Sequence, residues 1–270
     1  MKGLVQRGLS YFGYALRRTD ALRPFAPFVR HFKFPGAEFD MWIANAEAGE
    51  WYNQPHQEPL AEKRALRELI SPGDRVLEIG SHHGFTGLLL ANYVGENGFV
   101  LGVEANPQNA MIDQAQLALN GVRHLKFIHA AGGERAGKLK ISSDHNGHIC
   151  ADGIEVPAVT GDDLDAQYGP FDAVKIDVEG YEVEVLRGCK QLLTRCPKLA
   201  IELHMDGLPE RGYSLDDIWK LIDLKRYEGT MIVVPAFDSK LELFDPAKIP
   251  ARDPDWSYFA VNVFLRAKQK

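Results

Sequence analysis

Five side chains that can attract a cation or move a proton lie where apolar runs of the sequence end. They are Glu78, Glu104, Asp177, Glu202 and His204. In a mostly parallel sheet the carboxyl ends of the strands meet at one edge, and ligands bind in the crevice beyond that edge. We therefore expect these side chains to border one cleft, whose negative charge favours a positively charged ligand.

A glycine-rich stretch, VLEIGSHHGFTG at residues 76–87, follows the first of these runs. A loop that binds the pyrophosphate of a dinucleotide needs G-x-G-x-x-G, because its second glycine lets the phosphate approach the helix N-terminus. Here His82 stands at that second position, and Glu78 would repel a pyrophosphate. S-adenosylmethionine carries an ammonium and a sulfonium but no phosphate, so it suits this loop better than NAD does. Glu104 is expected to accept hydrogen bonds from its ribose hydroxyls.

The predicted cofactor contacts come from the ends of four consecutive strands of the core. They are Glu78, Gly80, Ser81, His82, Gly84, Glu104, Ala105, Ala131 and Asp177.

The composition is that of an ordinary globular protein. The chain has 270 residues, 45% of them hydrophobic and 25% charged, and its net charge of −6 argues against a general nucleic-acid binder. Its cysteines, Cys150, Cys189 and Cys196, lack metal-ligand spacing and suit a reducing compartment. No apolar run approaches the roughly 18 residues that span a bilayer. We expect a cytoplasmic protein, and contact with a membrane surface through its N-terminus is the open alternative.

Strand-like and helix-like segments alternate after residue 60, which predicts an α/β fold with a mostly parallel sheet covered by helices on both faces. Strands are expected at 75–80, 99–105, 124–131, 171–178, 199–204, 231–236 and 258–267. Helices are expected at 60–70, from Phe85, from Pro107, at 181–193 and at 215–222. Ser214 and Asp217 are expected to form a capping box before the last helix, and residues 138–160 a β-hairpin insertion.

The N-terminal segment differs from the rest of the chain, because residues 1–33 hold basic and aromatic side chains with Asp20 as the one acid. We expect a helical arm that packs on the domain, and an amphipathic segment that binds a membrane surface or a partner is the alternative. Residues 39–59 include Trp42, Trp51 and Tyr52 and suit either a lid over an acceptor or ordinary packing of the arm.

The most specific motif is KIDVEGYEVEVLRG at residues 175–188. Together with ISPGDRVLEIGSHHG, VLGVEANP and PKLAIELH it resembles the FkbM family of S-adenosylmethionine-dependent methyltransferases, over about residues 50–205. The resemblance implies a class I methyltransferase fold, Rossmann-like, with seven strands of which the last runs antiparallel. The chain would then divide into an N-terminal arm with a possible lid, residues 1–58, and an S-adenosylmethionine-binding methyltransferase domain, residues 59–270.

Two places depart from the family pattern, which usually has Asp where Glu78 stands and a small residue plus Asn where Ser81 and His82 stand. His82 is expected to replace that amide, either by a hydrogen bond to the methionyl end of the cofactor or by fixing the loop. His83 is expected to face solvent or to pack locally.

In this fold the reacting methyl is expected near the ends of the fourth and fifth strands. The predicted catalytic residues are therefore Asp177, Glu202 and His204, with His204 as a base whose intrinsic pKa suits neutral pH. Lys175 lies two residues before Asp177 and is expected to pair with it or with another buried acid. A divalent metal ion bound by Asp177, Glu202 and His204 is the open alternative.

These features predict methylation of a hydroxyl on a small molecule, sugar or natural product. Transfer to an amine or a carboxyl group, and a non-catalytic scaffold that binds S-adenosylmethionine, are the alternatives. We expect a small-molecule or glycan acceptor and no nucleic acid, whereas a homo-oligomer and peripheral membrane contact stay open.

Overall fold

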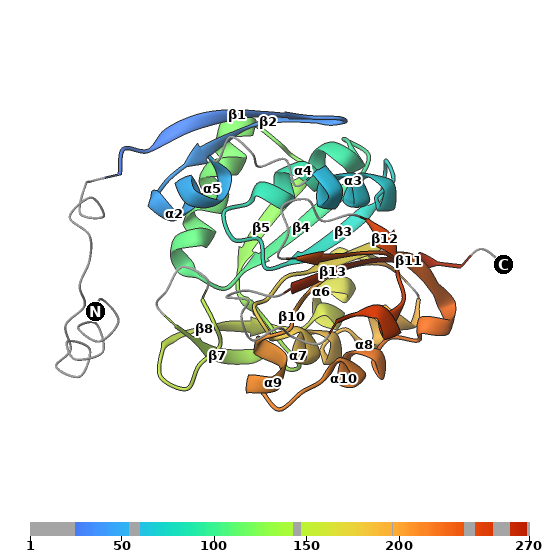
Figure 1. Ribbon diagram of the computed structural model, residues 1–270. Helices are drawn as coiled ribbons and strands as arrows, with labels where there is room; N and C mark the ends of the chain where they lie inside the picture. The colour runs from blue at the N-terminus through green and yellow to red at the C-terminus, as the bar shows by residue number, and fades with distance from the viewer. Residues whose placement is uncertain are drawn as a thin grey trace, which may run out of the picture.

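The computed structural model describes residues 25–53, 60–142, 147–195, 197–234, 241–250 and 260–268. At its centre lies an eight-stranded sheet with the spatial order β12-β11-β13-β10-β9-β3-β4-β5 (Figure 1). In chain order its strands are β3 Arg75–Ile79, β4 Phe99–Glu104, β5 Leu125–His129, β9 Ala173–Ile176, β10 Lys198–His204, β11 Tyr227–Val234, β12 Glu242–Leu243 and β13 Ala260–Ala267.

The sheet is parallel from β5 to β10, and β13 runs antiparallel to both β10 and β11. The predicted mostly parallel sheet with an antiparallel last strand is confirmed. The expected count of seven strands is wrong for the described residues, because the two-residue strand β12 pairs with β11 and adds an eighth. The strand order reverses between β3 and β9, which is where a parallel sheet opens a crevice at its carboxyl edge.

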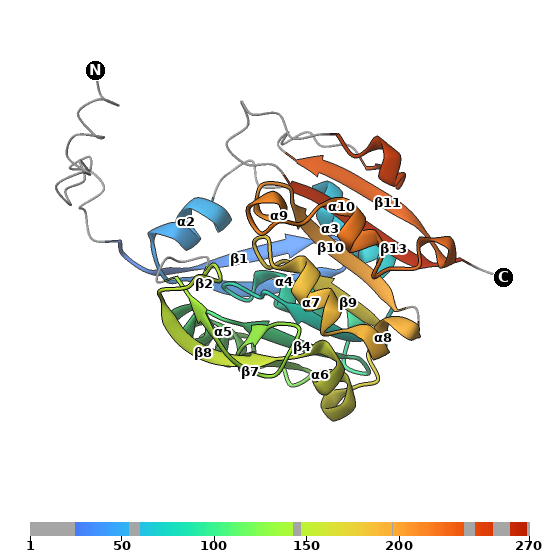
Figure 2. The same cartoon turned by 90° about the horizontal axis from the view of Figure 1, so that it is seen from below.

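Helices cover both faces of the sheet, as Figures 1 and 2 show. On one face lie α3 Leu60–Leu69, α4 Phe85–Val94 and α5 Pro107–Asn120. On the other lie α6 Gly161–Tyr168, α7 Glu182–Arg187, α8 Lys190–Thr194 and α10 Leu215–Trp219. Alternate residues of each strand enter two separate cores: Val76 and Ala173 pack towards α3 and α4, whereas Leu77 and Val174 pack towards α7.

The segment expected to be a helical arm, residues 1–33, is not helical where the structure describes it, at residues 25–33. Residues 28–43 form an antiparallel hairpin of β1 Phe28–Phe34 and β2 Ala37–Ile43, which lies over α4 and α5 (Figure 1). In its second strand, buried residues alternate with exposed or partly buried ones, which is the two-residue period of a strand and not the 3.6-residue period of a helix. Residues 1–24 of the predicted arm lie outside the described residues.

Side chains of α5 hold this hairpin on the domain. Gln116 accepts a hydrogen bond from the backbone N–H of Trp42 and donates one to its carbonyl, and Asn120 does the same with Asp40. After the hairpin comes a short helix, α2 Ala46–Tyr52, whose first turn is capped by Asn45. The predicted domain boundary at residue 58 lies outside the described residues and stays a prediction.

Most of the other predicted elements are present. The hairpin insertion consists of β7 Gly137–Ile141 and β8 Ile154–Val159, joined by β6 Ala131–Gly132 into a small sheet. The capping box of Ser214 and Asp217 begins α10. The helix expected at 181–193 is instead the two helices α7 and α8, which separate at Gly188, where a Cβ would lie 2.0 Å from the carbonyl oxygen of Gly133. Within the described residues, no helix has both the length and the apolar character needed to cross a bilayer.

Candidate functional site

The glycine loop between β3 and α4 adopts a conformation that depends on its glycines. Gly80 has φ +92°, and a Cβ there would lie 1.7 Å from the backbone oxygen of Asp177, so β3 and β9 approach closely only because this residue has no side chain. Gly84 has φ +76° at the start of α4, with a carboxylate oxygen of Asp113 directly beneath it. The other carboxylate oxygen of Asp113 accepts a 2.7 Å hydrogen bond from the Ser81 hydroxyl.

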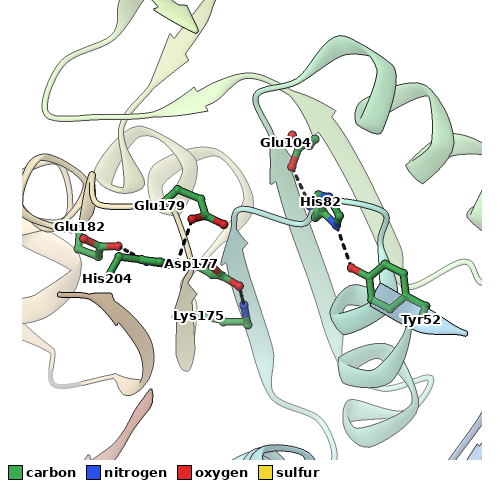
Figure 3. A network of polar contacts seen from close by, with 8 residues as sticks. All are labelled: Tyr52, His82, Glu104, Lys175, Asp177, Glu179, Glu182 and His204. Atoms are coloured by element: carbon green, nitrogen blue, oxygen red, sulfur yellow. Dashed lines mark hydrogen bonds and ion pairs between the residues drawn. The ribbon is translucent and has the colours of Figure 1, made fainter. Parts of the chain in front are cut away.

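Glu104, at the end of β4, is fixed from two sides. Its Oε2 accepts a 2.7 Å hydrogen bond from the backbone N–H of His82 (Figure 3). Its Oε1 accepts one of the same length from the backbone N–H of Asn106. Burial raises the pKa of this carboxyl to about 7 against the opposing effect of these hydrogen bonds. Each carboxylate oxygen has a second acceptor position. Glu104 can therefore still accept hydrogen bonds from a ligand such as the predicted ribose.

Glu78 is fully buried at the end of β3. Among the described residues, neither of its carboxylate oxygens has a hydrogen-bond partner. Burial raises its pKa to about 8, although the positive charge of nearby Lys175 acts in the opposite direction. A buried carboxyl without partners is costly in its ionised form. Such a group fits a cationic ligand, whose charge would stabilise the ionised form.

The two consecutive histidines contact each other and α2. His82 has φ +52°, and its Nδ1 lies 2.9 Å from the Tyr52 hydroxyl and 2.9 Å from Nδ1 of His83. The contact with Tyr52 supports the expectation that His82 fixes the loop, whereas its contact with the methionyl end stays a prediction. His83 is fully buried, so solvent exposure was the wrong alternative and local packing the right one.

The predicted ion pair at the end of β9 is present. Nζ of Lys175 lies 2.8 Å from Oδ2 of Asp177, and the exposed fractions of the two side chains are 6% and 30%. Burial alone would raise the pKa of Asp177, but the positive charges of Lys175 and His204 outweigh this effect. The pKa of Asp177 is therefore lowered below its ordinary value, and the carboxyl is ionised at neutral pH. Lys175 thus keeps a charged carboxylate at the edge of the cleft.

His204, at the end of β10, is held by a residue that the sequence did not reveal. Its Nδ1 lies 2.7 Å from Oε1 of the fully buried Glu182, and its Nε2 lies 3.4 Å from Oε2 of Glu179 and 3.8 Å from Oδ1 of Asp177 (Figure 3). Burial alone would lower the pKa of His204, but the hydrogen bond and charge of Glu182 raise it to about 10. The histidine is therefore protonated at neutral pH, unlike the near-neutral base expected from its residue type.

The predicted metal ligands are only partly brought together. Asp177 and His204 form a group with Glu179, and one potential ligand atom from each lies within 4.8 Å of the others. Glu202, the third predicted ligand, is not in this group, and in the sheet it lies opposite Asn262 of β13. Burial, followed by the charge of Asp177, raises the pKa of Glu202 to about 8.

The last two predicted contacts lie at the ends of the second and third core strands. Ala105 follows β4, and its carbonyl accepts a 3.0 Å hydrogen bond from His129. Ala131 is buried in β6 and pairs with Ala158.

The site as a whole has two halves that flank the ends of β3 and β9 (Figure 3). Glu104, His82 and Tyr52 form one half, and the groups around Asp177 and His204 form the other. Three functional candidates come from outside the predicted set: Tyr52, Glu179 and Glu182. The last two lie within the 175–188 motif, which marks the segment but not the partner of each side chain.

This chain is similar to one protein family and to several known proteins. The profile of the family described as "Methyltransferase FkbM domain" matches residues 78–228. A protein-L-isoaspartate O-methyltransferase of Fervidobacterium nodosum is 32% identical over 65 residues, which are 24% of this chain and only 33% of that relative's length.

Two solved structures are similar to this chain at low sequence identity. The FkbM methyltransferase of Methylobacillus flagellatus has a TM-score of 0.47 at 14% identity, over 75% of this chain and 50% of that one. Aeropyrum pernix fibrillarin, solved with natively bound S-adenosyl-L-methionine, has a TM-score of 0.49 at 16% identity, over 90% of this chain and 84% of that one.

Proposed function

Because this chain belongs to the FkbM family of S-adenosylmethionine-dependent methyltransferases, we propose that it methylates a hydroxyl oxygen of a small-molecule, sugar or natural-product acceptor. The observation that supports a hydroxyl acceptor is the pair of Glu182 and His204, whose Nε2 faces Asp177 at the carboxyl edge of the sheet. A hydroxyl must lose its proton when it is methylated, and a histidine held by a carboxylate is a suitable proton acceptor.

The buried acids around the loop fit the predicted methyl donor. S-adenosylmethionine, when bound, supplies a methyl group on a positively charged sulfur that an acceptor oxygen can attack in line. Glu104 would bind the ribose hydroxyls, and Glu78 would supply negative charge beneath the loop. Gly80 and Gly84 keep the backbone close to this space, since side chains at these positions would meet Asp177 and Asp113.

The second half of the site would bind the acceptor. Asp177, kept ionised by Lys175, can accept a hydrogen bond from the acceptor hydroxyl and orient it. Because the pKa of His204 is raised to about 10, only the minority of molecules with a neutral imidazole is active at neutral pH. In these molecules Nε2 of His204 would take the proton, and Glu182 would stabilise the imidazolium that forms. Correct alignment of the reacting groups can by itself lower the barrier by roughly 7–11 kcal/mol, and a positioned base adds about 10²–10⁴-fold.

Turnover on a panel of hydroxyl acceptors, followed through the demethylated cofactor, tests this proposal. His204→Asn should lower kcat by about 10²-fold or more and leave the affinity for S-adenosylmethionine within about twofold. His31→Asn, a change at an exposed histidine of β1, is the matched control and should leave both unchanged. Full activity of His204→Asn on hydroxyl acceptors would contradict the role of this histidine, and silence of the whole panel would favour the scaffold alternative.

A carboxyl acceptor is the second candidate. The protonated His204 would attract a carboxylate, and the relative from Fervidobacterium nodosum is named as a methyltransferase that acts on L-isoaspartate in proteins. A carboxylate has no proton to lose at neutral pH. His204→Asn would then raise KM for the acceptor by more than it lowers kcat, which separates this candidate from the hydroxyl one.

A divalent ion is not needed for this proposal, although Asp177, Glu179 and His204 have suitable donor atoms. Such an ion would polarise and orient the acceptor oxygen. Treatment with EDTA followed by addition of Mg²⁺ tests this alternative. Activity that is lost and then restored would show that an ion orients the acceptor oxygen. Activity that persists in EDTA would show that the side chains alone orient it.

A further inference from the structure

The consecutive histidines of the glycine loop gather with a glutamate of α2, next to the half of the site that contains Glu104, whose Oε2 accepts a hydrogen bond from the backbone of His82. We propose that Glu47, His82 and His83 form a binding site for a transition-metal ion of the Zn²⁺ type, which connects α2 to the glycine loop. This inference stands apart from the identity of the methyl acceptor. It concerns a site that none of the similarities to known proteins assigns.

The first support is the geometry of the ligand atoms. One potential ligand atom from each of the three residues lies within 4.8 Å of the others. The two imidazoles meet edge to face, with ring centroids 4.0 Å apart and their Nδ1 atoms 2.9 Å apart. Ligands bound to one tetrahedral ion at 2.0–2.2 Å lie about 3.3–3.6 Å from each other. Small rotations of these side chains would therefore bring them around a common ion.

The second support is the set of groups that orient the ligands. The Tyr52 hydroxyl lies 2.9 Å from Nδ1 of His82, and Nδ2 of Asn45 lies 3.3 Å from Nε2 of His83. Both come from α2 or its cap, the element that also supplies Glu47. Polar groups of one helix therefore hold both imidazole rings in place beside Glu47.

The third support is the burial of one of the ligands. His83 is fully buried beside Tyr52, and their rings lie 5.9 Å apart.

The ligand set selects the class of ion. Two imidazoles and one carboxylate suit Zn²⁺ and the neighbouring first-row ions, whereas Mg²⁺ and Ca²⁺ prefer oxygen ligands alone. Three protein ligands leave a fourth position of a tetrahedral ion for water or another small ligand. An ion bound here would fix α2 on the loop that begins α4.

Titration of tag-free, full-length protein with Zn²⁺, after removal of metal by dipicolinate and without cofactor or acceptor, tests the site. We expect saturable binding of one equivalent, a rise in Tm, and visible absorption bands when Co²⁺ replaces Zn²⁺. Glu47→Gln and His83→Gln should each weaken the affinity by at least about tenfold. If His83→Gln fails to fold, Glu47→Gln gives the result.

Two control variants define the location. Glu50→Gln changes the same residue type on the same helix outside the cluster, and Glu179→Gln changes the other candidate metal group; both should bind Zn²⁺ like the wild type. Absence of saturable binding would overturn the proposal, as would binding that Glu179→Gln abolishes and Glu47→Gln preserves. Affinity for S-adenosylmethionine is measured separately, so failure of the metal site and failure of the proposed function give different results.

Discussion

Glu104 illustrates how one buried residue can hold a loop and prepare it for a ligand. Its two oxygens accept the backbone N–H groups of His82 and Asn106, and this fixes the loop next to the cleft. Glu104→Ala would leave both amides unpaired at a cost of about 1–3 kcal/mol each in stability. Glu104→Gln is therefore the sharper test of ligand binding.

We expect Glu104→Gln to weaken S-adenosylmethionine binding at least tenfold, because a hydrogen bond to a charged acceptor is worth roughly 1.5–3 kcal/mol. Calorimetry gives the affinity, and circular dichroism confirms that the variant is folded. Glu96→Gln, at an exposed glutamate, should bind like the wild type. Equal affinities of Glu104→Gln and wild type for S-adenosylmethionine would contradict the prediction that Glu104 binds the ribose hydroxyls.

The pair of Glu182 and His204 predicts a signed pH effect. Since the pKa of His204 is raised to about 10, the fraction of neutral imidazole rises about tenfold with each unit by which pH increases towards that value. In the hydroxyl proposal kcat/KM should therefore rise with pH between 7 and 9. Glu182→Gln lowers this pKa towards 6.5, so the rising limb should move to lower pH.

The same pair affects stability. A histidine with a raised pKa stabilises the fold fully below its unfolded pKa near 6.5, and this contribution is lost as pH rises through about 10. Glu182→Gln should therefore reduce Tm at pH 6 by more than at pH 10.

If the pH dependence of kcat/KM does not shift in Glu182→Gln, the role of His204 as the proton acceptor is contradicted.

Residue types at strand ends predicted Glu78, Glu104, Asp177 and His204, and the structure places all four at the carboxyl edge of the sheet. The partners of these residues were not predictable in the same way. Glu182 reaches His204 from a different element, and Tyr52 reaches His82 from a helix 30 positions earlier in the chain. Such contacts depend on side-chain direction and tertiary packing, which periodicity does not contain.

At the scale of elements, the long apolar strands and the helices from Phe85 and Pro107 were predicted well, because their patterns extend over many residues. The β1–β2 hairpin was missed, since its basic and aromatic residues were assigned to a helical arm. The alternation in β2 and the positive φ of Gly36 at the turn explain the strand conformation. Short patterns of this kind fit either structure until tertiary contacts decide.

The junction of β3 with β9 gives a test at the element scale. Gly80→Ala places a Cβ against the carbonyl of Asp177 in a left-handed backbone conformation, and should cost about 3 kcal/mol or more in unfolding free energy. Gly73→Ala is the matched control, because Gly73 also has positive φ but has open space around it, and should cost about 1–2 kcal/mol. Equal losses in urea denaturation would contradict the close approach of the two strands.

At the scale of the whole molecule, the N-terminal segment is expected to act separately from the cofactor site. We propose that residues 1–24 contribute to membrane or acceptor contact, because this segment has five basic and three aromatic side chains and Asp20 as its one acid. Deletion of these residues leaves β1 intact and should reduce co-sedimentation with anionic liposomes several-fold while the affinity for S-adenosylmethionine stays unchanged. Equal co-sedimentation of both forms would favour the alternative of an arm that packs on its own domain.

The buried acids also couple the cofactor site to proton binding by the whole protein. The pKa values of Glu78 and Glu104 are raised to about 8 and 7, so in the absence of ligand both carboxyls hold protons that the unfolded chain releases near pH 4.5. Stability from these two groups should therefore fall as pH rises from about 4.5 to 8. A cationic ligand favours the ionised carboxylates, so its binding near pH 7 should release protons.

The most direct test is calorimetric titration of the full-length protein with S-adenosylmethionine and, in parallel, with NAD, at pH 7 in two buffers of different ionisation enthalpy. A rim of buried carboxylates that favours a positively charged ligand without phosphate predicts saturable binding of S-adenosylmethionine, a net release of protons, and no binding of NAD. Saturable binding of NAD together with no heat from S-adenosylmethionine would contradict it.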